Sequence, residues 1–209
     1  MEDAVTIALD HVAEFERAWA DPDNTAIELP PVDVNAVLQT HYRVDPELTY
    51  TTDMLWDMET RKAKAPDFYI PSVVGAHSAR VWEQADPDVF TRVSDQRLWL
   101  RPDTLEPIIE HVRFDQVKRS VYFIGASSYT TPDGEALHAG TGQPLFHVEH
   151  WVDGEPERPL NRWRIVHLTQ HPDRDLIAAF DALAATPYLR DFIEVHIRTV
   201  LGRTLERKN

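Results

Sequence analysis

Five short segments between residues 91 and 170 carry the alternation of apolar and polar side chains that a β-strand needs, and turn sequences separate them. The turns at residues 131–135 and 153–156 contain the Gly, Pro and Asp residues that reverse a chain. The five segments are residues 91–100, 108–117, 120–131, 142–152 and 162–170. They predict a curved antiparallel sheet, in which Gly125, Gly140 and Gly142 mark bulges or bends.

The segments around this sheet show helical spacing of their apolar residues. Thr186 and Pro187 are typical of a helix start, and Gly202 is typical of a helix end. Because prolines flank the charged residues 59–71, we expect a loop or lid there, preceded by a strand at residues 48–55. The predicted helices are residues 4–20, 32–42, 72–85, 176–183 and 189–201.

A chain of 209 residues is long enough for one full hydrophobic core. No low-complexity stretch divides it, so we expect a single α+β domain at residues 1–171. Residues 172–209 are predicted to form a C-terminal helical extension that packs on this domain or on a partner subunit. Such a tail suits an oligomer, and we expect a homodimer.

Composition excludes several classes of function. The formal net charge of −14 repels nucleic-acid phosphates and anionic membranes. No apolar run reaches the roughly 18–20 residues that span a bilayer, and the first ten residues carry acids where an export signal carries bases. We therefore expect a cytoplasmic protein that binds neither nucleic acid nor membrane. The absence of cysteine excludes disulfides, thiolate metal sites and cysteine nucleophiles.

Titratable residues inside the predicted strands indicate a pocket. His147 and Glu149 share one face of the strand at residues 142–152, and a carboxylate beside an imidazole orients it for proton abstraction. The alternative is that Glu149 lies on a solvated face. If the two faces of the strand are reversed, His150 enters the pocket and His147 and Glu149 leave it.

Three further residues are candidates for catalysis. His167 shares a strand face with Trp163 and is either a catalytic base or a satisfied core histidine. Asp53 lies in an aromatic segment whose burial would raise the pKa of a carboxyl group, although a surface aspartate is the plainer interpretation. Tyr122 could donate a hydrogen bond to an oxyanion, or pack only by its ring.

The predicted pocket also contains candidate substrate-binding residues, which are His77, Trp163, Phe146 and Tyr129. A metal site is not expected, because no His-x-His pair exists and His147 and His150 point to opposite faces of a regular strand. No cofactor is predicted.

Four stretches of the sheet resemble the strands of NTF2-like proteins of the SnoaL polyketide-cyclase and ketosteroid-isomerase type. The resemblance implies a curved antiparallel sheet wrapped on N-terminal helices to form a cone-shaped pocket, and enzymes that transfer protons through His, Asp and Tyr without a cofactor. The tail from Pro172 and the insertion at residues 57–71 depart from the family pattern, so no catalytic set is carried over. The stretches are EHVRF at 110–114, YFIGASSY at 122–129, FHVEHW at 146–151 and RWRIVH at 162–167.

Three hypotheses follow. The first is a cofactor-independent lyase, isomerase or cyclase that acts by acid–base catalysis on a small, largely apolar metabolite in specialised, polyketide-like biosynthesis. The second is a small-molecule binding protein, since a long helix after a sheet also resembles the helix-grip architecture of START and Bet v 1 carriers. The third is a non-catalytic partner subunit. Inward convergence of two or more titratable side chains would favour the first.

Overall fold

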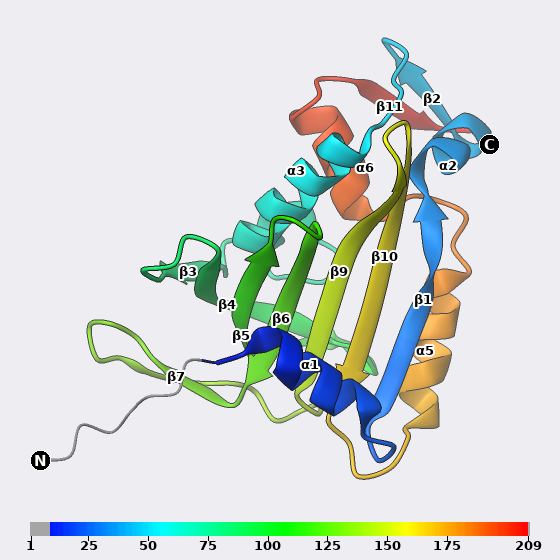
Figure 1. Cartoon of the computed structure of the whole chain (residues 1–209). Helices are drawn as coiled ribbons and strands as arrows, with labels where there is room; N and C mark the ends of the chain where they lie inside the picture. Colours follow the sequence, from blue (N-terminus) through cyan, green and yellow to red (C-terminus); the bar gives the residue numbers. More distant parts are fainter. Residues whose placement is uncertain (1–8, 209) are drawn as a thin grey trace, which may run out of the picture.

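A seven-stranded antiparallel sheet forms the body of the molecule (Figure 1). The computed structural model describes residues 9–208, and the part of the first predicted helix before residue 9 lies outside them. The strand order is β1-β10-β9-β6-β5-β4-β3. The strands of this sheet are β1 (Thr25–Asp33), β3 (Arg80–Glu83), β4 (Val89–Leu98), β5 (Arg101–Asp115), β6 (Ser120–Ala126), β9 (Phe146–Glu155) and β10 (Arg158–His167).

Six helices and two small two-stranded sheets complete the described chain. The helices are α1 (His11–Ala20), α2 (Val34–His41), α3 (Thr52–Lys64), α4 (Pro66–Tyr69), α5 (Arg174–Ala184) and α6 (Asp191–Thr199). β2 (Tyr42–Asp45) pairs with β11 (Thr204–Arg207), and β7 (Ser128–Thr130) pairs with β8 (Ala136–His138). None of the described helices is long and apolar enough to cross a membrane.

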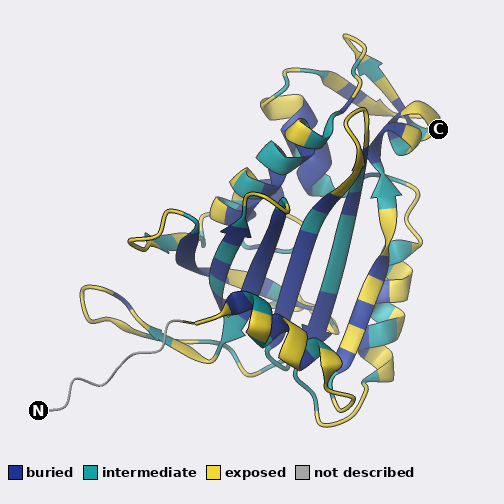
Figure 2. Cartoon of the chain, in the orientation of Figure 1, coloured by how far each residue is buried: buried dark blue, intermediate teal, exposed yellow. Residues whose placement is uncertain are grey.

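The large sheet has helices on both faces. α1 crosses the front face in Figure 1, where Phe15 and Ala18 pack with Tyr122, Ile124 and Val166. We call this side the α1 face. The opposite side, the cavity face, packs against α3, α5 and α6. Because both sides are covered, the central strands are dark along most of their length in Figure 2. Residues of the cavity-face core include Phe123, Phe146, Val148, Ile165, Ala63 of α3 and Phe180 of α5.

The edge strand β1 is absent from the sequence prediction, because Pro30 and Pro31 suggest a chain break. The strand accommodates both prolines at an irregularity in its register, between Leu29 and Val32. Proline is tolerated at an edge strand or bulge, where its missing N–H leaves no central ladder bond unmade. β1 pairs with β10 and thereby places the N-terminal part of the chain beside the last long strand.

The predictions for residues 48–71 are wrong. A helix, α3, replaces most of the predicted strand and the predicted loop, and its start is capped by the Thr51 hydroxyl, which accepts from the Met54 N–H at 3.2 Å. Leu55 and Met58 form an ordinary apolar stripe, but the same stripe continues through Glu59 and Lys62, which are also buried. Charged residues on the buried side of α3 hide its amphipathic pattern.

The predicted helix at residues 72–85 is also wrong, because the valines of this segment pair with strand β4 of the sheet. β3 pairs with β4, and Val74 forms a bridge with Gln96. In the tail, both predicted helices are present as α5 and α6. However, α6 begins at Asp191 and has no side-chain cap, so Thr186 and Pro187 do not start it. β11 was not predicted.

The α+β class with a large antiparallel sheet is confirmed. α5 and α6 contribute Phe180 and Phe192 to the two main cores, so the tail packs on its own chain.

Candidate active site

An interior cavity of about 80 Å³ lies between the cavity face and helices α3, α4 and α6. Aromatic and aliphatic side chains make most of its wall, and five polar side chains interrupt this wall. The polar set is Lys62, Arg92, Gln96, Glu110 and His150, and the apolar set is Ile70, Val73, Trp99, Phe123, Phe146, Val148, Trp163 and Phe192. Polar groups in so apolar a setting fix a ligand's orientation in binding sites.

Two of the polar side chains, Lys62 and His150, belong to a buried cluster with Glu59 and Asn161. Nζ of Lys62 lies 2.5 Å from Oε2 of Glu59 and 3.0 Å from Nδ1 of His150, and it stands over the Phe192 ring, 4.2 Å from the centroid. The side-chain amide of Asn161 donates to Oε1 of Glu59 at 2.9 Å. α3 supplies Glu59 and Lys62 one helical turn apart, and β9 and β10 supply the other two residues. The three ionisable groups are almost completely buried.

The cluster determines the proton positions on His150. Burial and then the Lys62 charge lower the pKa of His150 to about 4, so the ring is neutral near pH 7. An ammonium group can only donate, and Nδ1 of His150 therefore accepts from Lys62 while Nε2 carries the ring proton. Oε1 of Glu59 lies 3.5 Å from Nδ1, which is a weaker contact than the Lys62 bond.

The ion pair also holds Glu59 ionised. Burial alone would raise the pKa of Glu59, but the charge of Lys62 and its hydrogen bond to Glu59 outweigh burial and lower this pKa to about 2. Burial lowers the pKa of the Lys62 ammonium against the attraction of Glu59. A lysine with a lowered pKa can release its proton more readily than a solvated one.

The other three polar side chains, Arg92, Gln96 and Glu110, join β4 to β5. Nε of Arg92 donates to Oε2 of Glu110 at 2.7 Å, and the side-chain amide of Gln96 donates to the same oxygen at 3.2 Å. Nη1 of Arg92 bonds to the carbonyl oxygen of Ala63 in α3, at 2.9 Å. Both of these donors use one carboxylate oxygen, and within residues 9–208 no hydrogen bond is made to Oε1 of Glu110. The cavity thus holds a buried carboxylate with one free oxygen.

Three of the predicted catalytic residues lie on the α1 face, away from this cavity. Because His150 faces the cavity, its neighbours His147 and Glu149 face the other way, which is the reversed assignment considered above. Tyr122 lies opposite Glu149 on the neighbouring strand and packs against Phe15 of α1. The choice of face depends on which helices cover each side, and strand alternation alone does not encode it.

A different network holds the residues of the α1 face. Nε of Arg164 donates to Oε2 of Glu149 at 2.7 Å and Nη2 to Glu16 at 2.8 Å, while the guanidinium stacks on Phe15 and Trp19. His147 accepts a bond from the Gly125 N–H at 3.1 Å. The pKa of Tyr122 is raised, first because α1 buries its side chain and second because its hydroxyl donates a hydrogen bond to Glu149. These contacts attach α1 to the sheet.

The other predicted residues lie in the cavity wall, in the core beside it or outside both. Trp163 and Phe146 line the cavity, as their predicted role requires, and Trp163 stacks on His150 with centroids 5.0 Å apart. His167 lies on the cavity face but is packed between Phe146 and Phe180, outside the cavity lining. His77 is exposed in a turn and has a φ of 58°. Tyr129 belongs to the β7–β8 hairpin, where it contacts Trp82.

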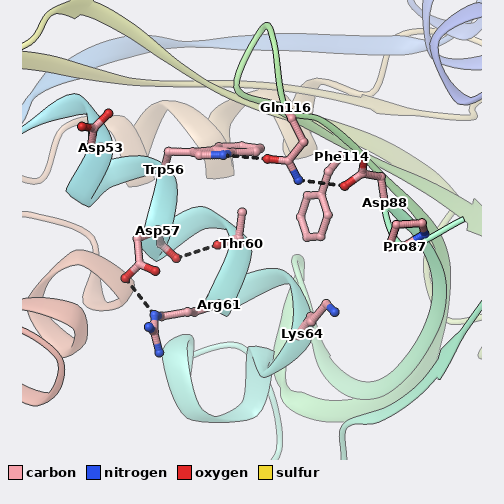
Figure 3. A pocket seen from close by; sticks show the side chains of 10 residues that line it. All are labelled: Asp53, Trp56, Asp57, Thr60, Arg61, Lys64, Pro87, Asp88, Phe114 and Gln116. Carbon is pink, nitrogen blue, oxygen red and sulfur yellow. Dashed lines mark hydrogen bonds and ion pairs between the residues drawn. The ribbon is translucent and has the colours of Figure 1, made fainter.

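Asp53 follows the plainer of its two interpretations and lies at the surface, so the burial that a catalytic role requires is absent. Its side chain is 81% exposed and pairs with Nη2 of Arg119 at 2.6 Å. It lies at an open surface groove of about 600 Å³ between α3 and the starts of β4 and the β5–β6 turn (Figure 3). In that groove Asp57 binds Arg61 at 2.7 Å, and Gln116 connects Trp56 to Asp88. The groove is open to solvent and its charged groups are largely paired.

The sequence analysis missed Glu59, Lys62, Arg92, Gln96 and Glu110. For four of them a signal exists. Arg92 and Glu110 lie directly opposite each other in the β4–β5 pairing, as opposite charges on adjacent buried strands. Glu59 and Lys62, three residues apart, could have been read as a helical ion pair. Within residues 9–208, no group of three or more His, Asp or Glu side chains could hold a metal ion.

The buried histidines predict an acid-sensitive fold. Burial lowers the pKa of His167 to about 4, as it does for His150. Between about pH 6.5 and 4 the unfolded chain binds protons that the folded chain refuses, so the free energy of unfolding falls as pH falls through this window. We expect urea unfolding curves from pH 7 to 4.5 to show this decrease.

Two variants check that result. His167→Phe keeps an aromatic ring among Phe146 and Phe180, and we expect a flatter pH dependence than in the wild type. His171→Asn changes an exposed histidine and is expected to leave the pH dependence unchanged. A free energy of unfolding that stays constant from pH 6.5 to 4.5 would contradict the assignment of neutral buried histidines.

Neither family models nor curated proteins match this sequence. Among solved structures, the chain is similar to the ZhuI aromatase/cyclase from Streptomyces sp. R1128, with a TM-score of 0.54 and 9% identity over 85% of this chain and 96% of that chain. The major latex-like protein 151 from Panax ginseng gives a TM-score of 0.48 and 11% identity, over 86% of this chain and 97% of that chain. The di-domain aromatase/cyclase StfQ from the steffimycin biosynthetic pathway gives 0.46 and 13%, over 91% and 48%.

These likenesses bear on the fold alone. The first relates the chain to the fold of an aromatase/cyclase, and the other two, below 0.5, are too loose to carry an argument. The helix-grip architecture, which the sequence left as the alternative to the NTF2-like one, stays a prediction. The cone-shaped NTF2-like pocket stays a prediction.

Proposed function

We propose that this protein carries out acid–base chemistry of the lyase, isomerase or cyclase kind on a small, largely apolar molecule bound in the interior cavity. The observation that carries the proposal is the convergence of Lys62, Arg92, Glu110 and His150 on one aromatic-walled cavity. Burying ionisable groups is costly, and sites that transfer protons are where such groups are commonly arranged together. Glu110 takes the role of base that the sequence analysis assigned to His147, and His150 takes the role of oxyanion donor that it assigned to Tyr122.

The roles of the two residues follow from their free atoms. The free Oε1 of Glu110 accepts a proton from a carbon next to a substrate carbonyl group. As the C–H bond breaks, its electron pair moves to the carbonyl oxygen, and the Nε2–H of His150 donates a hydrogen bond to that oxygen. Lys62 keeps the His150 ring in this tautomer through its bond to Nδ1. Proton return to the same or another carbon completes an isomerisation or an exchange.

The charge balance of the cavity indicates a neutral ligand. Lys62 is paired with Glu59 and Arg92 with Glu110, so no positive charge remains without a partner for an anionic group. The aromatic walls favour a flat, apolar body. A planar cyclic ketone combines these properties.

A second candidate is a helix-grip binding protein without catalysis, which the same pairing favours, since every charge at the cavity already has an opposite partner in the fold. The homodimer, the boundary at residue 171 and the absence of nucleic acid as a partner remain proposals, and light scattering of the purified chain would test the first of them.

The two candidates separate in one experiment. The protein is incubated in D₂O with 1-tetralone, 2-tetralone or cyclohexanone, and loss of the proton signal next to the carbonyl is followed by NMR. We expect at least one ketone to exchange faster than in buffer alone. Binding, seen as ligand line broadening, without faster exchange supports the binding protein. If none of these ketones binds and none exchanges faster than in buffer, both candidates are overturned for this ligand class.

A further inference from the structure

Four side chains next to the cavity have buried hydrogen-bond donors without a partner. Within residues 9–208, no acceptor reaches Nε1 of Trp99, Nε1 of Trp163, Nε2 of Gln143 or either ring nitrogen of His167. Leaving a buried donor unsatisfied costs about 1–3 kcal/mol, so folded proteins contain few of them. The side chain of His167 is 0% exposed, which makes its isolation the most complete of the four.

Three of these side chains surround one residue, Phe180 of α5. Its ring centroid lies 4.5 Å from that of Trp99, 5.8 Å from that of Trp163 and 5.7 Å from that of His167. Gln143 belongs to the same group, since its side-chain oxygen accepts from the backbone N–H of Trp99 at 3.0 Å and leaves only its amide nitrogen free. Unpartnered donors are therefore concentrated around one apolar side chain.

The chemistry of this group is that of a donor set. An indole nitrogen can only donate, the free atom of Gln143 can only donate, and a neutral histidine donates from one ring nitrogen. No carboxylate takes part. The partner that such a set fits is an acceptor oxygen without a proton to offer, such as a carbonyl or ether oxygen.

The donor set is continuous with the cavity. Trp99, Trp163 and Phe146 line the cavity on one side, and the same three rings contact Phe180 or His167 on the other. Phe180 thus lies behind the cavity wall, in contact with Trp99 and Trp163 of that wall and with His167. Phe180 belongs to α5, which ends at Ala184, whereas Phe192 beneath Lys62 belongs to α6, which begins at Asp191.

We propose that Phe180 is a gate over a second subsite, formed by Trp99, Trp163, Gln143 and His167, that binds an acceptor oxygen of the ligand. The inference rests on the proposed function for the location of the ligand. It specifies the substrate class further: a flat molecule with a second acceptor oxygen, at the end remote from the carbonyl group that meets His150.

The test uses the Phe180→Ala variant and two matched probes, 9-fluorenone and fluorene, which differ by one carbonyl oxygen. Binding is followed by the indole N–H signals in ¹H–¹⁵N spectra, which the variants Trp99→Phe and Trp163→Phe assign. We expect Phe180→Ala to bind fluorenone about tenfold more tightly than the wild type does and about tenfold more tightly than it binds fluorene. The Trp99 or Trp163 indole signal should move downfield with fluorenone only.

Two controls keep the result interpretable. Leu176→Ala removes another fully buried side chain of α5, one outside the aromatic group, and should not improve fluorenone binding. If Phe180→Ala does not fold, Phe180→Leu provides a smaller enlargement for the same measurement. Equal affinity for the two probes, or indole signals that do not respond because buried water already satisfies them, would overturn the subsite.

Failure of the subsite and failure of the proposed catalysis give different results. If the ketones exchange in D₂O but fluorenone does not shift the indole signals, the gate is overturned and the proposed catalysis is retained. Indole shifts without any exchange activity support the subsite in a binding protein.

Discussion

Replacing Lys62 by methionine is expected to lower the free energy of unfolding by about 3–5 kcal/mol, because the change leaves Glu59 charged and buried without its partner. Lys62 has a side chain that is 3% exposed, and that of Glu59 is 0% exposed, so water cannot replace the lost interaction. His150 also loses the donor to its Nδ1. Urea unfolding at pH 7, followed by circular dichroism, measures the change.

Lys64 provides a matched control on the same helix. It pairs with Glu83 at 2.9 Å, but the two side chains are 44% and 72% exposed, and Lys64→Met is expected to cost less than about 1 kcal/mol. The double variant Glu59→Gln/Lys62→Met removes both charges and should recover much of the lost stability. If Lys62→Met costs no more than Lys64→Met, the ion pair is not buried in solution, and the cavity as described is incorrect.

The same pair gives a second, acid-side signature. The pKa of Glu59 is about 2 when folded, below its ordinary value near 4.5, so its contribution is complete above the ordinary value and is lost as pH falls toward 2. Removal of Glu59 in the double variant should therefore reduce the pH dependence below about 4.5, whereas the histidine effect above that pH should persist.

Replacing Glu110 by glutamine is expected to reduce ketone exchange by a factor of about 10²–10⁴, the usual effect of losing a general base. Glutamine has nearly the same shape, and its amide oxygen can still accept from Arg92 and Gln96, which both bind Oε2 in the wild type. The fold should thus persist while the proton acceptor is lost. The exchange rate of the best ketone, measured by NMR in D₂O, is the readout.

The control is Glu47→Gln, which changes an exposed glutamate in the loop before α3 and should not affect exchange. His150→Asn complements the test, since loss of the oxyanion donor should lower the exchange rate without removing the base. A Glu110→Gln protein that is stable, binds the ketone and exchanges at the wild-type rate would limit Glu110 to a structural role with Arg92.

The sheet was accessible from sequence because turn residues and alternation are local signals. The five strands from residue 91 onward were found within a few residues of their ends, except that β5 begins at Arg101 and not at residue 108, and β7 and β8 were not separated as a hairpin. The orientation of these strands was not accessible. Whether His147 or His150 faces the cavity depends on α1 covering one side and α3 the other, and these contacts join residues far apart in sequence.

The polar half of the site was missed for a related reason. Sequence patterns identify buried positions by their apolar residues, and Glu59 and Lys62 occupy such positions in α3 with opposite charges. A charged residue indicates a surface unless its partner is known, and here part of the network comes from β9 and β10, about 90–100 residues later. Trp163 and Phe146 were predicted in the pocket because they are apolar and lie on strands.

The pairing of the chain ends has a consequence for synthesis. β1 joins β10, with a hydrogen bond between the side chains of Thr25 and Thr169 across 144 positions, and β2 joins β11 near residue 207. A ribosome makes the N-terminal strands first, and they have no partner until nearly the whole chain has emerged. Contacts of such long sequence separation form slowly, and an unpaired strand edge is prone to aggregation. A nascent chain of this protein therefore depends on β10 and β11 to cover the edges of β1 and β2.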